Sequence, residues 1–374
     1  MPRGVPDDRI LALDVLRGLT MAAMVVVNNP GDWDTVYAPL LHAEWHGWTP
    51  TDLIFPFFLF IVGVAMTLSR RTFGPARIVV RRSVTIYALG LAIGLFARPS
   101  IANLRFAGVL PRIAICYLVS ALVVRAATRG GIDTSARARG VLLGVLALIL
   151  LGYWALLTYV AWPGAVPGDL TPEGNLAAYV DRAWLPGRLY NKTWDPEGLL
   201  STLPAIGTTL LGVVAGLRLL RDPSPSSREW HLIAAGLGAT VVGWVWGQSF
   251  PINKNLWTSS YVLFTGGLAT LLFAGVYWLV DVRGSRWWIR PFVVLGSNAI
   301  ALFVLSDVVA IVLLKIPASL ESGKTGTLQS YIYERVFAPI GDPRFASLAF
   351  ALAMLALMYV LLAEMYRRRI FLKV

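Results

Sequence analysis

The sequence predicts an all-α integral membrane protein, a polytopic bundle of about ten transmembrane helices. Of the 374 residues, 56% are hydrophobic and only 14% are charged, which is more apolar surface than a soluble domain of this size needs. The apolar residues fall into runs of about 20, the length that an α-helix needs to cross the hydrocarbon core. Short polar segments rich in Arg, Pro and Gly separate these runs.

Each apolar run is one expected span, and no internal repeat divides the chain, so we predict a single transmembrane domain over residues 1–374. The expected spans are 10–28, 51–69, 83–100, 109–126, 139–161, 198–218, 231–250, 258–281, 291–315 and 345–366.

The distribution of cationic residues predicts the orientation. One alternate set of loops carries about twice as many Lys and Arg residues as the other, and such residues mark the cytoplasmic side. We therefore expect both termini in the cytoplasm and the loop after the first span on the opposite side. The net charge of +12 is spread over these short loops, so topology explains it better than nucleic-acid binding does.

The single cysteine, Cys116, lies inside an apolar run, which excludes a disulfide framework and a Cys-based metal site. The short polar N-terminus leads into an apolar run without a small-residue cleavage site, so we expect no cleavable signal peptide.

The segment from Asn28 to Gly63 is the most informative, because it holds two of the three histidines beside polar and aromatic residues. Polar groups at a membrane boundary are costly unless paired, and they often mark function. The imidazole of His42 could act as a general acid or base, or be acylated as a nucleophile. The alternative is an interfacial histidine that only binds a loop carbonyl.

His42 and His46 have the i, i+4 spacing of a helical metal site. Glu44 and Asp52 are near in sequence, but neither is a clear third ligand, and Gly47 and Pro50 disfavour a regular helix. We therefore expect no metal.

Other polar residues each have a structural and a functional interpretation. Asp52 either caps the second span or orients His42. Asp14 and Arg17, one helical turn apart, form an ion pair, or Arg17 binds an anionic ligand. Arg112 either extends to the interface or has a buried acidic partner such as Asp195 or Glu197.

Two further polar groups stand at span boundaries. Asn253, Lys254 and Asn255 precede Trp257, an arrangement that suits carbohydrate and also suits an ordinary interface loop. Ser297 and Asn298 lie in the ninth span, where they could bond to a neighbouring helix or line a pore. From the residues alone, the sequence describes a helical membrane protein with a polar site on the non-cytoplasmic side, and a transporter leads an enzyme.

Ordered motifs along the chain resemble the heparan-α-glucosaminide N-acetyltransferase family and its shorter bacterial relatives. They are LDVLRG (13–18), VVVNNPG (25–31), LLHAEWHGWTPTDLIFPFFLFIVG (40–63), GVLPRIAICY (108–117), WDPEGLLSTLPAIGTTLLGVVAG (194–216), PINKNLWTSSYVLFTGG (251–267) and PFVVLGSNAI (291–300).

The resemblance implies a transmembrane enzyme that moves acetyl from cytoplasmic acetyl-CoA to the amine of a glucosamine. The family's active histidine falls on His42 and its asparagine on Asn28. Beside these two, Asp52 is the third catalytic candidate, on the interpretation that it orients His42. His46 stands where the lysosomal enzyme has Asn. Because the chain lacks that enzyme's luminal N-terminal domain and extra first span, we expect a small amino sugar or a cell-wall fragment as acceptor.

The expected substrate-binding residues are Trp45, Glu197, Asn253, Lys254, Asn255 and Asn298. The nucleotide of CoA is polyanionic and suits arginine, with Arg17, Arg71, Arg82, Arg112 and the run Arg367 to Arg369 as candidates. The expected location is a bacterial inner membrane with the histidine loop facing the periplasm, in contact with lipid, and a homodimer is left open. The alternatives are a sugar or cell-wall-fragment transporter and an O-acyltransferase of a surface glycan.

Overall fold

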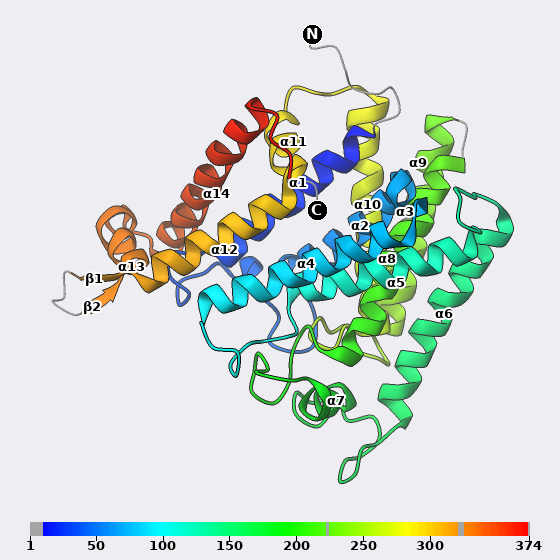
Figure 1. Ribbon diagram of the computed structural model, residues 1–374, viewed down its shortest axis with the longest axis horizontal. Coiled ribbons are helices and arrows are strands. Elements are labelled where there is room, and N and C mark those ends of the chain that lie inside the picture. The colour runs from blue at the N-terminus through cyan, green and yellow to red at the C-terminus, as the bar shows by residue number, and fades with distance from the viewer. Residues whose placement is uncertain (1–9, 222–223, 321–324, 373–374) are drawn as a thin grey trace. The chain divides into compact units, whose positions relative to one another are not determined.

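The computed structural model describes residues 10–221, 224–320 and 325–372 (Figure 1). Two compact units make up the chain, unit 1 from Met1–Leu41 and Leu272–Lys373, and unit 2 from His42–Leu271. Arg3 and Arg9, which contribute to the predicted orientation, lie outside the described residues. The single-domain organisation stays a prediction.

Unit 2 is built from helices and holds the histidine loop. Its elements are η2 (Pro50–Leu53), α2 (Ile54–Leu68), α3 (Arg70–Phe73), α4 (Ala76–Ala97), α5 (Val109–Ala127), α6 (Ala136–Tyr159), α7 (Leu176–Trp184), α8 (Leu199–Arg221), α9 (Pro225–Trp246) and most of α10 (Ser259–Tyr277). Figure 1 shows α2, α4, α5 and α8 running beside one another, in agreement with their contacts.

Glycine allows α2 and α8 to cross with their backbones in contact. A methyl group added at Gly63 would collide with the carbonyl of Thr209, and one added at Gly212 would collide with the carbonyl of Phe60. Small residues permit such close approach between membrane helices, where lipid supplies no hydrophobic driving force between them. Asp52 and Glu197 lie just before α2 and α8, respectively. The crossing therefore fixes the positions of these two helices, which begin at the polar loops.

Unit 1 contains the first helix and about the last quarter of the chain. Its elements are α1 (Leu11–Asn28), η1 (Ala38–Leu40), the end of α10, η3 (Trp278–Val282), α11 (Arg290–Ser297), α12 (Ala299–Lys315), the antiparallel strands β1 (Pro317–Ser319) and β2 (Thr325–Thr327), α13 (Leu328–Ile332), η4 (Tyr333–Phe337), η5 (Ala338–Ile340) and α14 (Pro343–Arg367). Gly18 and Gly296 give α1 and α11 the same kind of close crossing.

The structure confirms the all-α membrane class, and helices occupy each expected span. Among the described residues, eight helices are long and apolar enough to cross a membrane. The ninth expected span is not one continuous helix, because α11 and α12 meet at Asn298 with a bend of 81°. The seventh expected span, α9, is less hydrophobic than those eight helices, since Glu229 and His231 lower its mean hydropathy.

Candidate active site

The histidine loop is an irregular segment, 42–49, that other parts of unit 2 hold in place. Gly47 has a φ of +99°, which favours glycine, and its N–H donates to the carbonyl of Ile252 at 2.8 Å. The indole N–H of Trp45 donates to the carbonyl of Leu170 at 2.8 Å, and its ring meets Trp194 edge-on. The loop is therefore fastened both to the 251–258 turn and to the long 160–198 connection.

His42 and Asp52 form a hydrogen-bonded dyad. His42 Nδ1 lies 2.7 Å from Asp52 Oδ1, and the side chain of Asp52 is 1% exposed while that of His42 is 52% exposed. An ionised carboxylate only accepts hydrogen bonds, so Nδ1 carries a proton and its N–H donates a hydrogen bond to Asp52. This assigned tautomer leaves the lone pair of Nε2 free to accept a proton.

Further hydrogen bonds fix the position of Asp52. Its Oδ2 accepts hydrogen bonds from the backbone N–H groups of Ala43 and Thr49, both at 3.0 Å. Its carbonyl oxygen accepts from the hydroxyl of Tyr261 at 2.5 Å. Thr49 and Asp52 form a capping box at the start of η2. The two interpretations of Asp52 are thus compatible, because one carboxylate caps the helix and contacts His42.

Lys254 completes a three-residue cluster at the dyad. Its Nζ lies 3.0 Å from His42 Nδ1, 3.1 Å from His42 Nε2 and 3.6 Å from Asp52 Oδ1. The side chain is 16% exposed. Burial lowers the pKa of the Lys254 amine, against the opposing charges of Asp52 and Glu197.

The turn that carries Lys254 has a rigid backbone. Trp257, 1% exposed, adopts a φ of +53°, a conformation that a bulky residue keeps only when its surroundings impose it. Its indole N–H donates to Thr208 Oγ1 at 3.0 Å, and its ring meets Phe55 and Tyr261 edge-on. Asn253, which is fully buried, accepts the N–H of Leu256 and contacts the ring of His46.

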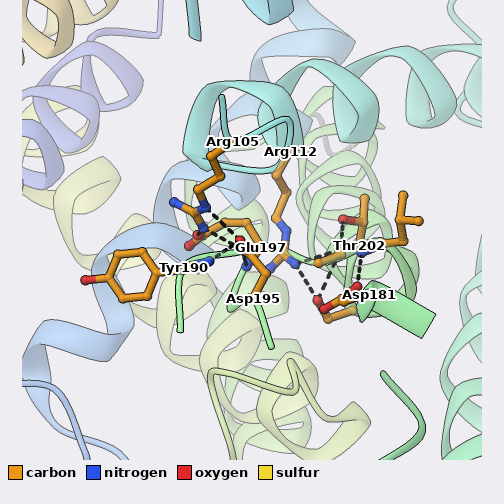
Figure 2. A network of polar contacts seen from close by, with 10 residues as sticks. Arg105, Arg112, Asp181, Tyr190, Asp195, Glu197 and Thr202 are labelled. Atoms are coloured by element: carbon orange, nitrogen blue, oxygen red, sulfur yellow. Dashed lines mark hydrogen bonds and ion pairs between the residues drawn. The ribbon is translucent and has the colours of Figure 1, made fainter. Parts of the chain in front are cut away.

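A second polar network lies at the start of α8 (Figure 2). Arg105 binds Asp195 with two hydrogen bonds of 2.7 and 2.5 Å and also contacts Glu197. These carboxylates hold the pKa of the Arg105 guanidinium well above its usual range. Its guanidinium lies over the ring of Tyr190, whose N–H donates to Asp195. Glu197, expected at the substrate, is therefore an ion-pair partner of Arg105.

Arg112 is a buried cation, in line with the second of its two predicted arrangements. Only 1% of it is exposed, so it does not extend to the interface, and its Nη2 donates to the carbonyl of Gly198 and to Ser201 Oγ. Its guanidinium lies over the ring of Trp257. Arg105 makes the direct bonds to Asp195 and Glu197, and these two carboxylates act on the buried Arg112 through their charge. Among the described residues, Arg112 Nε and Nη1 have no hydrogen-bond partner.

Asp181 of α7 lies near Thr202 in the same network, as Figure 2 shows. Its Oδ1 accepts the N–H of Leu199, the first residue of α8, at 2.8 Å. The side chain packs so closely on Gly198 that a methyl group there would collide with it. Burial raises the pKa of the Asp181 carboxyl to about 6.

Several predicted site residues lie in unit 1. Asn28 ends α1 with an exposed side chain, and it stays a predicted catalytic residue. Arg17 forms the expected ion pair with Asp14, at 3.2 Å. The amide of Asn298 donates to the carbonyl of Ile370 and accepts the N–H of Leu372, so it fixes the C-terminal backbone where a substrate role was expected.

The arginines that were expected to bind CoA differ in their exposure and in their contacts. Arg71 is exposed on α3, whereas Arg82 lies over the ring of Tyr117 and keeps a buried Nε without a partner among the described residues. Arg367 and Arg368 both bind Glu364. In the described part of the chain, no three His, Cys, Asp or Glu side chains gather as metal ligands would.

Comparison with known proteins identifies the family. Residues 9–249 match the family described as "Heparan-alpha-glucosaminide N-acetyltransferase, catalytic". The chain belongs to this family. It is 29% identical to the heparan-alpha-glucosaminide N-acetyltransferase of Homo sapiens and 28% identical to that of Mus musculus, over 79% of its own length. It covers 52% and 53% of those proteins, so the chain spans about half the length of the curated relatives that it matches.

The part that matches the N-acetyltransferase family contains the dyad and the Arg105 network, and it ends before the turn with Lys254. Arg105, Asp181 and Tyr261 were not identified from the sequence as parts of the candidate site. Arg105 could have been found, because it is a cation in a loop expected on the same side as the two carboxylates of the DPEG motif. Asp181 and Tyr261 carry no comparable signal.

Proposed function

We propose that the chain is a transmembrane N-acetyltransferase that moves acetyl from cytoplasmic acetyl-CoA to the amine of an amino sugar on the non-cytoplasmic side. The observation that carries the proposal is the 2.7 Å contact between His42 Nδ1 and Asp52 Oδ1 in a member of this family. A buried, fully bonded carboxylate sets the tautomer and the orientation of an exposed imidazole, as a general base requires.

His42 acts on the amine of the acceptor. As the amine attacks the thioester carbon, His42 Nε2 takes the amine proton, and the imidazolium is stabilised by the adjacent Asp52. The C–N bond forms, the C–S bond breaks, and the proton passes to the departing thiolate of CoA. Direct transfer is favoured over an acyl-imidazole, because the dyad orients Nε2 as a base.

Charge and aromatic groups support the choice of substrates. The orientation predicted from the cationic loops puts Arg82 towards the cytoplasm. Its Nε, which has no partner among the described residues, suits a phosphate of CoA. Around His42, the paired rings of Trp45 and Trp194 and the polar 253–255 turn suit a sugar. The location that we propose is a bacterial inner membrane, with the histidine loop in the periplasm.

The test uses the purified full chain in lipid nanodiscs with acetyl-CoA and glucosamine. We expect N-acetylglucosamine as product, with one CoA thiol released for each amide formed. A product acetylated on a hydroxyl would indicate the O-acyltransferase instead. Acetyl-CoA binding without any product, together with sugar uptake into proteoliposomes, would indicate the transporter and contradict the proposal.

A further inference from the structure

Lys254 places a primary amine at the atom that the proposed reaction uses as its base. Its Nζ lies 3.1 Å from His42 Nε2. An acceptor amine must come within about 2.6–3.2 Å of that nitrogen for its proton to be transferred. Nζ also lies 3.0 Å from Nδ1, so the amine is beside the imidazole ring, and a rotation of the lysine side chain brings it to the position at Nε2 that the amine of the amino sugar has to take.

The surroundings of Lys254 favour a reactive amine. The side chain is 16% exposed, and burial lowers its pKa, which increases the share of the neutral, nucleophilic form. Trp257 and Asn253 fix the backbone of the turn, so the amine stays within reach of the base. Lys192, by contrast, is exposed on the long 160–198 connection, where no imidazole contacts it among the described residues.

We propose that Lys254 is an intramolecular acetyl acceptor, which the chain acetylates when acetyl-CoA is bound and no amino sugar is present. This inference rests on the proposed function. The Nζ amine attacks the thioester carbon, and one of its protons passes to His42 Nε2. The C–N bond forms as the C–S bond breaks, and the thiolate takes the proton. The products are Nζ-acetyl-Lys254 and free CoA.

Acetylation changes the site in two ways. The side chain loses its positive charge beside Asp52, and the amide nitrogen is no longer a nucleophile. Because Lys254 and the amino sugar compete for the same position at Nε2, an excess of amino sugar protects Lys254. Protection distinguishes acetylation at the active site from chemical acetylation of an exposed lysine.

Peptide mass spectrometry of the full chain in nanodiscs, incubated with acetyl-CoA alone, tests the proposal. We expect one acetyl group on Lys254, little on Lys192, and loss of the Lys254 label in excess glucosamine. His42→Ala should reduce the rate of labelling by at least about 100-fold, the lower end of general-base catalysis. Lys254→Arg should leave no label in this peptide, and Lys192→Arg should leave the Lys254 label unchanged.

Two outcomes would overturn the inference and separate it from the proposed function. If the chain acetylates glucosamine while Lys254 stays unmodified, the function stands and the inference fails. If neither glucosamine nor Lys254 is acetylated although acetyl-CoA binds, the function fails and the inference with it. Equal labelling of Lys254 in the wild type and in His42→Ala would show chemical acetylation, and would also overturn the inference.

Discussion

His42 Nδ1 lies 2.7 Å from Asp52 Oδ1, although the two residues belong to different parts of the backbone, an exposed loop and the first turn of a helix. The same carboxylate accepts the N–H groups of Ala43 and Thr49. The dyad is thus formed within a short stretch of chain that folds back on its own helix cap. Its geometry depends on local hydrogen bonds, so substitutions within this stretch should separate catalysis from stability.

The two histidines of the loop should differ in their importance. Only His42 contacts Asp52, whereas His46 contacts Asn253. His42→Ala should lower the rate of acetyl transfer by about 10²–10⁴-fold, the contribution of a general base, and leave acetyl-CoA binding near that of the wild type. His46→Asn, which keeps a polar group towards Asn253, should retain substantial activity. Steady-state kinetics with glucosamine would contradict this assignment if His46→Asn were the inactive variant.

Asp52 and Thr49 allow the cap to be separated from the dyad. Asp52→Asn should reduce turnover by about 10²–10⁴-fold, because a neutral amide neither stabilises the imidazolium nor fixes the tautomer of His42. Thr49→Ala removes the other half of the capping box, at a cost of about 1 kcal/mol in stability, and should keep near-normal turnover. Turnover and thermal melting of both variants check this expectation. Equal losses of turnover would show that the cap alone matters.

The sequence predicted the helical class and the segments that form helices, because runs of apolar residues follow directly from the thickness of the bilayer. It did not predict the bend at Asn298. That bend depends on where the polar amide finds partners, the backbone of Ile370 and Leu372, which lie far along the chain. Long-range hydrogen bonds of this kind leave no periodic pattern in the sequence.

The candidate site shows the same division between local and distant contacts. The contact of His42 with Asp52 was foreseen as one of two alternatives, since a short segment contains both residues. The contact of Lys254 with His42 joins residues that are 212 positions apart. Its sequence motif suggested a carbohydrate-binding turn or an interface loop, but not a contact with the histidine. Likewise, the sequence suggested Arg112 as the partner of the DPEG carboxylates, whereas Arg105 makes the direct bond to Asp195.

Asp181 should make stability depend on pH. Burial raises the pKa of its carboxyl from 3.8 to about 6, so the folded chain holds this proton more tightly than the unfolded chain does. The stabilising contribution is fully present below 3.8 and is lost as the pH rises to about 6. Asp181→Asn keeps an acceptor for Leu199 and should stabilise the chain at about pH 8, by up to about 3 kcal/mol.

Thermal melting in one detergent at about pH 4.5 and pH 8 checks this sign, because the difference between variant and wild type should grow with pH. Asp34→Asn, at an exposed loop position, is the matched control and should show no such trend. A variant that is less stable than the wild type at the higher pH would show that the ionised carboxylate stabilises the start of α8.

Arg82 should contribute to donor binding. Its Nε is buried without a partner in the described part of the chain, so a phosphate oxygen of CoA would gain a charge-assisted hydrogen bond there. Loss of such a bond costs about 1.5–3 kcal/mol, so Arg82→Gln should raise the KM for acetyl-CoA by about tenfold or more, with little change in kcat. Arg71→Gln, at an exposed arginine, is the control. An unchanged KM for Arg82→Gln would place the CoA contact elsewhere.

The orientation in the membrane can be tested with single cysteines, because the native Cys116 is buried. Asp34→Cys and Ser224→Cys are both at exposed positions, and five of the candidate spans separate them, those that contain α2, α4, α5, α6 and α8. An odd number of crossings puts the two positions on opposite sides. In intact cells, a membrane-impermeant maleimide should label Asp34→Cys from outside and leave Ser224→Cys unlabelled.

A third cysteine decides whether α9 crosses the membrane despite its lower hydropathy. Trp287, 89% exposed, follows the span that contains α10. If α9 crosses, two spans separate positions 224 and 287, and both are cytoplasmic, as the arginines at 283, 286 and 290 favour. Trp287→Cys should then resist labelling in intact cells and react after permeabilisation. Labelling from outside would show that α9 stays on one side, and labelling of Ser224→Cys from outside would reverse the orientation proposed for the active site.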